Sequence, residues 1–143
     1  MTVQYNPEYP TPRPAQWGVL YRSSTGFWEG VKRHELVIQK CKQCGTWLHP
    51  PRPMCPNCRS AEHDWVPSKG KGTVYSWVTY HESPHPGFKA PYSVVLVELE
   101  EGVRLISNLI DVLPDDIYIG MPVEVVFDDI AEDMTLPKFR RVV

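Results

Sequence analysis

The feature that most limits what this chain can fold into is a pair of C-x-x-C motifs, which together use all four of its cysteines. Cys41-Lys42-Gln43-Cys44 is followed after ten residues by Cys55-Pro56-Asn57-Cys58. Each motif places two sulfur atoms on one tight turn, and two such turns facing each other supply four soft ligands for a tetrahedral ion. Gly45 lets the first turn direct its N–H groups at sulfur, and Pro56 stiffens the second turn. We therefore expect Zn²⁺ to be bound by Cys41, Cys44, Cys55 and Cys58.

Other uses of the four cysteines fit the sequence less well. Two disulfide bonds would require an oxidising compartment, and no apolar secretory segment stands at the N-terminus. A redox C-x-x-C motif opens the helix after a strand of an α/β unit, whereas these two copies lie among prolines. Because four thiolates leave no coordination position for water, the expected zinc is structural and no residue of the site is assigned as catalytic. His49 and His63 raise a mixed-ligand alternative, but four cysteines suffice, so we expect both histidines to face solvent or to be hydrogen-bonded.

Charge divides the chain into two halves of opposite sign. Residues 1–71 carry ten Lys and Arg against five Asp and Glu, a balance of +5, and residues 72–143 carry five against twelve, a balance of -7. Nucleic-acid-binding proteins expose basic surface because phosphate neutralisation supplies most of their non-specific affinity, so the acidic half has the wrong sign. The longest apolar cluster, Val94–Val97, has the length of a strand and predicts no membrane span. We expect a cytoplasmic protein of one ordinary domain or two small ones.

The first part of the chain is rich in proline and lacks a periodic apolar pattern. We expect residues 1–22 to form an extended arm, disordered alone or laid along a partner. A serine and threonine cap at residues 23–25, followed by apolar residues at helical spacing, predicts a short helix of two to three turns. Gly30 is unfavourable inside that helix. The aromatic pair Phe27 and Trp28 either packs in the core or docks on another subunit, and the sequence leaves both open.

Short apolar segments flank the cysteine motifs. Residues 36–39 run as a strand into the first motif, residues 46–49 leave it as the return strand, and Trp65 and Val66 lead out of the second. We call each C-x-x-C turn a knuckle. A strand, a knuckle, a hairpin and a second knuckle in this order are typical of a rubredoxin-like zinc ribbon. Roughly thirty residues cannot bury a sufficient core, so metal binding, on the order of 10 kcal/mol or more in small zinc modules, must carry much of the stability. We place the helix and the ribbon at residues 23–68.

A glycine-rich linker, residues 67–72, precedes a second domain that we place at residues 69–143. Five segments there have the composition or alternation of strands: 73–80, 93–99, 103–110, 122–127 and 137–142. Glu100-Glu101-Gly102 predicts a hairpin with the glycine at positive φ. Five strands without room for a long crossover helix fit a small barrel, for which the OB-fold is the commonest solution and an SH3-like barrel the alternative. The expected fold is therefore mainly β, with a short N-terminal helix, a rubredoxin-like zinc ribbon and a five-stranded OB-fold barrel.

Several segments together resemble a bacterial and archaeal family that joins an N-terminal helix and rubredoxin-like zinc ribbon to an OB-fold. Its members were long described as a domain of unknown function. Besides the two cysteine motifs, the resemblance is carried by Phe27-Trp28-Glu29-Gly30, Gly72-Thr73-Val74-Tyr75-Ser76-Trp77 and Gly120-Met121-Pro122-Val123-Glu124-Val125. Each of these is short, but their order and spacing are specific, and the resemblance covers the chain from Phe27 to about Phe139.

The resemblance implies an auxiliary subunit of acyl-CoA metabolism. Members of that family assemble with thiolase-like enzymes, including thiolases, acetyltransferases and the retro-aldolases of steroid side-chain degradation, and some are fused to or paired with hotdog-fold hydratases. The thiolase-fold partner then carries the catalytic Cys, His or Tyr and performs C–C bond cleavage or acyl transfer. For this chain the resemblance implies a hetero-oligomer, expected to be a heterotetramer, in which it contributes structural zinc and part of a site for a CoA thioester. The four cysteines match the family's zinc ligands, and no catalytic residue is carried over.

The segment most like an active site of its own is the loop at residues 81–92. The chain has no G-x-S-x-G, P-loop or G-x-G-x-x-G motif. Two histidines beside Glu82 could act as acid and base, and the lysine of the loop could meet a phosphate or carboxylate. We favour a proline-stiffened surface loop whose aromatic residues pack on the barrel or on a partner, because no matched pair of titratable groups stands on rigid elements. The candidate partner or acyl-CoA contacts are Phe27, Trp28, Arg33, His85, Phe88, Lys89 and Tyr92.

CoA carries several phosphate charges, which an acidic barrel should repel. If this chain contacts the phosphates, the basic residues of its first half are the better candidates. They include Lys32, Arg33, Lys40 and Arg52. Alternatively, the partner binds the phosphates and the barrel covers only the acyl end.

A single-stranded nucleic-acid-binding protein is the alternative function, since zinc ribbons and OB-folds both occur in that class. Tyr75 and Trp77 would project on one face of a strand and could stack bases, or they could pack in the barrel core or an interface. A stacking platform needs basic surroundings to follow the phosphate backbone, and the balance of -7 in this half does not provide them. We therefore prefer the auxiliary subunit.

Overall fold

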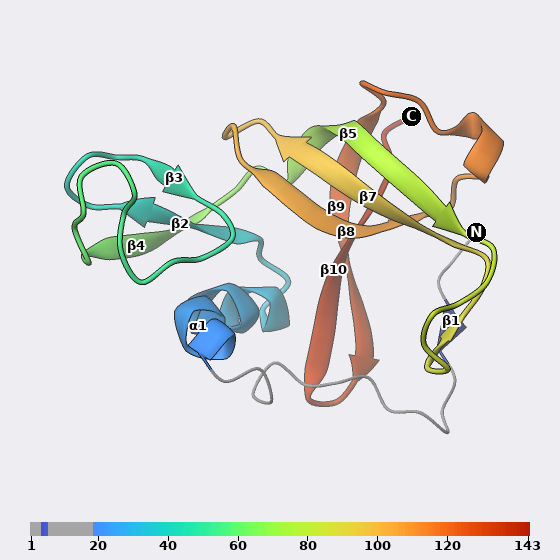
Figure 1. The fold of residues 1–143 in the computed structure, drawn as a ribbon, viewed down its shortest axis with the longest axis horizontal. Helices are drawn as coiled ribbons and strands as arrows, with labels where there is room; N and C mark the ends of the chain where they lie inside the picture. The colour runs from blue at the N-terminus through green and yellow to red at the C-terminus, as the bar shows by residue number, and fades with distance from the viewer. Residues whose placement is uncertain (1–3, 6–18) are drawn as a thin grey trace.

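The computed structural model describes residues 4–5 and 19–143, and their side chains from residue 23 onward. These parts form one α-helix, a small antiparallel sheet and a closed barrel, with the helix lying beside both sheets (Figure 1). The helix is α1 (Val19–Lys32), and the small sheet holds β2 (Val37–Cys41), β3 (Trp47–Leu48) and β4 (His63–Pro67). The barrel strands are β5 (Lys71–Tyr80), β7 (Tyr92–Leu99), β8 (Arg104–Ile110), β9 (Pro122–Ala131) and β10 (Met134–Arg141).

Helix α1 begins earlier than the sequence predicts and contains glycines where it meets the ribbon. Because α1 starts at Val19, the serine and threonine residues 23–25 lie inside the helix, so the predicted cap is wrong and the predicted arm ends too late. A Cβ atom on Gly26 would approach Trp65 Nε1 to 2.2 Å, and one on Gly30 would approach Val37 Cγ2 to 2.6 Å. The low helix propensity of Gly30 is therefore offset by the close packing of α1 against β4 and β2.

The small sheet has the predicted arrangement of a zinc ribbon. Its order is β3-β2-β4, and both outer strands pair antiparallel with the central strand β2. Strand β2 ends at Cys41, which pairs with His63 at the start of β4, so both cysteine motifs lie at the end of the ribbon remote from the barrel core. The two predicted strands, 36–39 and 46–49, are confirmed as β2 and β3, and Trp65 and Val66, which lead out of the second motif, lie in the third strand, β4.

The barrel closes in the order β5-β7-β8-β10-β9 and back to β5. Strand β8 pairs with β10 in parallel and the other neighbours are antiparallel, so the fourth strand in the chain lies between the first and the fifth. This Greek-key closure is that of the predicted OB-fold. Gly102 has a φ of 91° in the β7–β8 hairpin, as predicted. A bulge between Val74 and Ser76 leaves Tyr75 without a partner on β7, which sequence alternation does not reveal.

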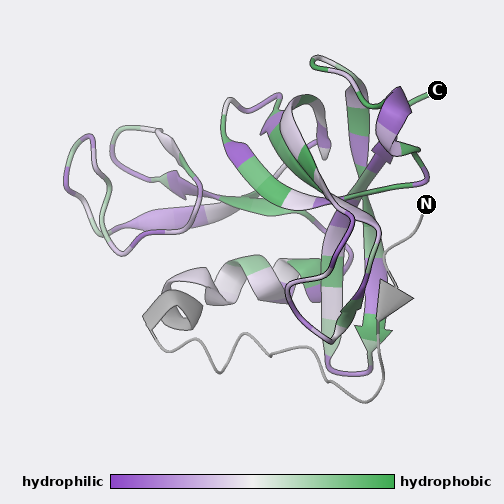
Figure 2. Cartoon of the chain, turned by 45° about the vertical axis from the view of Figure 1, so that its right-hand side comes forward, coloured by the Kyte–Doolittle hydropathy of each residue, from purple (hydrophilic) through white to green (hydrophobic). Residues whose placement is uncertain are grey.

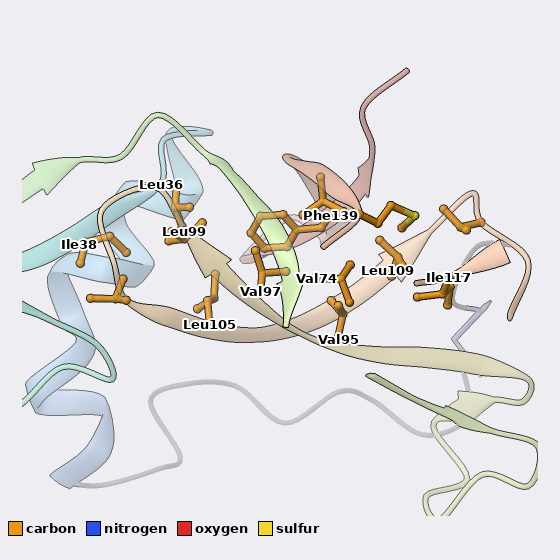
Figure 3. Packing of buried hydrophobic residues seen from close by; sticks show 14 of the residues in the cluster. Leu36, Ile38, Val74, Val95, Val97, Leu99, Leu105, Leu109, Ile117 and Phe139 are labelled. Carbon is orange, nitrogen blue, oxygen red and sulfur yellow. The ribbon is translucent and has the colours of Figure 1, made fainter. Parts of the chain in front are cut away.

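One hydrophobic core extends through the barrel, the helix and the base of the ribbon. Phe139, Val97 and Leu109 pack inside the barrel, and the cluster continues to Leu36 and Ile38 beneath the ribbon (Figure 3). Phe27 and Val31 of α1 belong to the same cluster, and Figure 2 shows apolar residues recurring along the barrel strands and α1. The cysteine end of the ribbon has a separate small cluster of Cys41, Leu48 and Cys55, with Cys58 packed against it.

The loop after β5 contains the short strand β6 (Phe88–Lys89), which pairs with β1 (Gln4–Tyr5). This pairing is the only part of the predicted arm before α1 that lies within the described residues. A short 3₁₀ helix, η2 (Pro114–Asp116), joins β8 to β9. Among the described residues, the structure contains no helix with the length and apolarity needed to cross a bilayer.

Candidate functional site

The two cysteine motifs adopt the same backbone geometry fourteen residues apart. In the first, Gly45 N donates to Cys41 O at 3.0 Å and Cys41 N donates to Thr46 O at 2.9 Å. In the second, Arg59 N donates to Cys55 O at 2.9 Å and Cys55 N donates to Ser60 O at 2.8 Å. Gly45 and Arg59 occupy equivalent positions with φ of 74° and 66°. The sequence indicates this conformation through glycine in the first knuckle only, because an arginine rarely adopts it.

The two knuckles bring the four sulfur atoms together at one point. All four Sγ atoms lie within 4.8 Å of one another, with Cys41 Sγ 3.5 Å from Cys58 Sγ and Cys44 Sγ 3.6 Å from Cys55 Sγ. Tetrahedral zinc with Zn–S bonds of about 2.3 Å places its sulfur ligands about 3.8 Å apart. None of the four cysteines forms a disulfide. The donor set and its spacing therefore fit a four-coordinate zinc ion.

Hydrogen bonds and crowding shift the pKa values of these thiols in opposite directions. The Thr46 hydroxyl, 3.0 Å from Cys44 Sγ, and the Thr46 backbone lower the pKa of Cys44 to about 6. At Cys58 the Ser60 backbone lowers the pKa, but burial and the three neighbouring thiols outweigh it and raise the pKa to about 12. Four thiolates cannot share so small a volume without a positive charge between them, and a divalent ion supplies it.

The two histidines near the motifs lie outside this four-sulfur cluster. His63 is half-buried against Trp65, and its Nδ1 lies 3.3 Å from Ala61 O, which confirms a hydrogen-bonded histidine. His49 differs from the expectation, because its ring is mostly buried beside Phe27 and its Nδ1 has no hydrogen-bond partner. Burial lowers the pKa of His49 to about 4, so its imidazole is neutral at pH 7.

The loop at residues 81–92 packs through its aromatic side chains. Phe88 lies 5.7 Å from the ring of His85 and 6.0 Å from that of Tyr92, which in turn stacks on Tyr80 at 5.1 Å. Gly87 N donates to His85 Nδ1 at 2.9 Å, which makes that nitrogen an acceptor. No ion pair or hydrogen bond joins Glu82 to a histidine within residues 19–143. The structure therefore does not bring together the acid and base that the loop could have supplied, and its lysine, Lys89, is exposed.

The remaining candidate contacts lie on or near α1. Phe27 is only 5% exposed and meets Trp28 edge to face at 5.2 Å, so this residue of the aromatic pair belongs to the core. Trp28 is half-buried. Arg33 follows the helix on an exposed turn, where its guanidinium lies 3.7 Å from the carboxylate of Glu35.

A cavity of about 390 Å³ opens where α1, the ribbon and the barrel meet. Most of its lining is apolar and includes Phe27, Trp28, Pro50, Leu105, Ile106 and Pro137. His49 also lines it, together with Ser107 and Asn108 of β8. The sequence did not predict this cavity, because its walls come from α1, the segment after β3, β8 and β10, which lie far apart in the chain.

The base-stacking platform proposed for nucleic acid is not formed. Tyr75 is the extra residue of the bulge, and the guanidinium of Arg104 covers its ring at 3.7 Å from the centroid. Trp77 packs against the barrel core. The two rings are therefore not equivalent exposed residues on one strand face, and the expectation that they project together is wrong.

The fold and the four-sulfur cluster define a protein that combines a zinc ribbon with an OB-fold. Family models agree: the ChsH2 rubredoxin-like zinc ribbon domain matches residues 28–64, and the ChsH2 C-terminal OB-fold domain matches residues 65–128. The chain belongs to this ChsH2 family. A probable enoyl-CoA hydratase alpha subunit of Thermomonospora curvata is 44% identical over 99% of this chain, and a DUF35 domain-containing scaffold protein of Methanocaldococcus jannaschii is 43% identical over 74%.

A solved structure described as an Ltp2-ChsH2(DUF35) aldolase contains a chain that is 43% identical, with a TM-score of 0.82 over 94% of this chain and 100% of that one. The benzoylsuccinyl-CoA thiolase subunit BbsA of Thauera aromatica is 33% identical over 49% of this chain and 48% of BbsA. This chain spans 43% of the length of the Thermomonospora hydratase subunit and 77% of the Methanocaldococcus scaffold protein.

Proposed function

We propose that this chain is a non-catalytic auxiliary subunit that assembles with a thiolase-fold enzyme acting on acyl-CoA thioesters. The observation that carries the proposal is the match along 94% of this chain to a subunit of a two-protein aldolase, with the four-sulfur site formed in the same chain. The relatives described as a hydratase alpha subunit and a thiolase subunit support acyl-CoA chemistry as the setting. The partner performs the C–C bond cleavage or acyl transfer.

The role of zinc in this proposal is structural. Cys41, Cys44, Cys55 and Cys58 hold the ion, and its four-coordinate site offers no open position for water or substrate. Bound zinc supplies a fixed cross-link between the two knuckles, which keeps the ribbon in one conformation for assembly. Such thiols stay reduced in the cytoplasm, which is the location we propose.

The catalytic residues are assigned to the partner because neither the 81–92 loop nor the lining of the cavity beside α1 contains an acid–base pair. The histidines of the 81–92 loop do not meet Glu82, and His49 is neutral and enclosed. A catalytic base must lie within hydrogen-bond reach of the proton that it removes, and a proton acceptor needs a pKa near the working pH. The pKa of about 4 at His49 places it well below that range.

In the complex, we place the acyl end of the thioester against this chain and the CoA phosphates on basic groups. The acidic barrel half disfavours the phosphates, whereas Arg33 and Lys40 lie in the basic half. The expected assembly is a heterotetramer. Nucleic-acid binding has no comparable support, because Tyr75 lies in the bulge beneath Arg104 whereas Trp77 packs against the barrel core.

Co-purification tests the proposal. A tagged wild-type chain, expressed in its native cell, should isolate a thiolase-fold protein in equal amount, identified by mass spectrometry and counted by native mass spectrometry. The purified complex should bind one zinc ion per copy of this chain and turn over an acyl-CoA, and this chain alone should not. Turnover by the isolated chain, or a wild-type isolate without any thiolase-fold protein, would contradict the proposal.

A further inference from the structure

The outer face of three barrel strands carries apolar side chains at positions that are usually polar. In the antiparallel register, Ser76, Leu96 and Ile106 lie in one row across β5, β7 and β8, and Val78, Val94 and Asn108 lie in the next. Directly opposed residues project from the same side of a sheet. Ile106 is 72% exposed and Val78 is 54% exposed. We call Val78, Val94, Leu96 and Ile106 the apolar face.

The two rows of residues that contain the apolar face include no charged residue. In the row beyond Leu96 and Ile106, Glu98 and Arg104 face each other and form an ion pair of 3.2 Å. The same arginine covers the ring of Tyr75, so the charges at this border are already partnered. Solvent-facing sides of antiparallel sheets are normally polar, whereas the buried centres of protein interfaces are depleted of charge and enriched in aromatic and apolar groups.

Ile106 lies in the walls of three hollows, one of which is the cavity beside α1. The 390 Å³ cavity, a hollow of about 170 Å³ over β5 and β7, and one of about 340 Å³ beside Tyr80 and Phe88 all include Ile106 in their walls. Ser107 and Asn108 also line both the first and the third. Ile106 therefore stands on a ridge between depressions, and Figure 1 shows its strand, β8, beside β7 and β5 in one continuous layer.

We infer that the apolar face is the surface on which the thiolase-fold partner docks, with the cavity beside α1 receiving an apolar side chain of that partner. This inference rests on the proposed function and specifies its interface. It places the docking surface on the barrel strands and the mouth of that cavity, because Ile106 and Val78 are exposed whereas Phe27 of the aromatic pair is buried in the core.

The chemistry of the face selects a protein partner. Nucleic acid and anionic lipid require clustered cations, and these two rows contain none. The related chain that this protein matches over 100% of its length belongs to a two-protein aldolase, which favours a different chain over a second copy of this one. An apolar ridge beside a cavity also supplies the anchor and pocket that typically dominate binding energy at interfaces.

A charge introduced at the ridge tests the inference against a matched control. Ile106→Asp places an unpaired carboxylate at the centre of the face, whereas Ile119→Asp makes the same change at a residue that is 64% exposed in the turn before β9. We expect Ile106→Asp to weaken the affinity for the purified partner roughly 100-fold or more and Ile119→Asp to change it less than about threefold. Ile106→Thr keeps a β-branched strand residue and should weaken binding about tenfold.

The measurements are isothermal titration of the thiolase-fold protein identified with the wild type, together with zinc content and thermal unfolding of each variant. If folded, zinc-loaded Ile106→Asp and Ile106→Thr bind the partner like the wild type, the inference is wrong although the proposed function stands. If the wild type itself binds no thiolase-fold protein, the proposed function fails. A wild-type homodimer that Ile106→Asp dissociates, with partner binding unchanged, assigns the face to a second copy and also overturns the inference.

Discussion

Losing the metal should unfold the cysteine end of the ribbon, which we call the tip, and leave the barrel intact. In the small cluster at the tip, Leu48 is the only buried residue other than cysteine among the described residues, and burying one leucine contributes about 1.5–3 kcal/mol. Structural zinc contributes on the order of 10 kcal/mol or more in small modules. The metal therefore stabilises the tip more than apolar packing does, and packing cannot replace it. Cys44→Ser, at an exposed ligand position, removes one thiolate without disturbing the barrel core.

The structure indicates which amides should lose protection. Loss of about half of the zinc contribution, about 5 kcal/mol, corresponds to roughly a thousandfold faster local opening or more. Hydrogen exchange followed by mass spectrometry should show this acceleration at the knuckle amides of Cys41, Gly45, Cys55 and Arg59. Val97, in the barrel core, should exchange at the wild-type rate.

A control at the same end of the ribbon separates ligand loss from general perturbation. Met54 lies between the two motifs and is 54% exposed, so Met54→Ser should leave zinc content and exchange unchanged. Two results would refute the reasoning. One is a metal-free Cys44→Ser protein whose knuckle amides stay protected, and the other is a barrel that loses protection together with the ribbon.

Three further predictions concern the packing at Gly26, the titration of His49 and the ion pair between Asp128 and Lys138. Gly26→Ala should lower the free energy of unfolding by about 1–3 kcal/mol, because its Cβ would overlap Trp65; urea unfolding measures this. His49 has a folded pKa of about 4 and an unfolded value of about 6.5, so the unfolded state binds more protons and stability falls as pH decreases from 7.5 to 5.5. That loss should be about 1 kcal/mol greater than in His49→Gln, and equal slopes would contradict the buried neutral histidine. Asp128→Asn should destabilise the protein by about 1–3 kcal/mol in thermal unfolding, since it removes the carboxylate paired with buried Lys138, and an unchanged melting temperature would refute this.

Local patterns in the sequence predicted the zinc site and most strands. The spacing of Cys41, Cys44, Cys55 and Cys58 fixes two turns and thereby their ligands' proximity, and β-branched alternation marks the barrel strands. These features depend on residues close to one another in the chain, so a pattern of a few residues contains the necessary information.

Features set by contacts between distant segments were not predicted. Tyr75 occupies a bulge because β5 pairs with both β7 and β9 in the closed barrel, and no local alternation reveals it. His49 is mostly enclosed because Phe27 of α1 packs beside it, although we expected it to face solvent or to be hydrogen-bonded at the end of the return strand. Ile106 was counted as one more apolar strand residue, and only the register of β8 shows that it faces outward.

Because one core runs from Phe139 through Val97 to Leu36 and Val31, the barrel, the ribbon and the helix stabilise one another. Dividing the chain in the glycine-rich connection between β4 and β5 would expose apolar surface on both parts, although the composition of that connection is typical of a domain boundary. Gene fusions and module swaps in this family should therefore succeed when helix, ribbon and barrel move as a single cassette, and fail when the barrel is transferred alone.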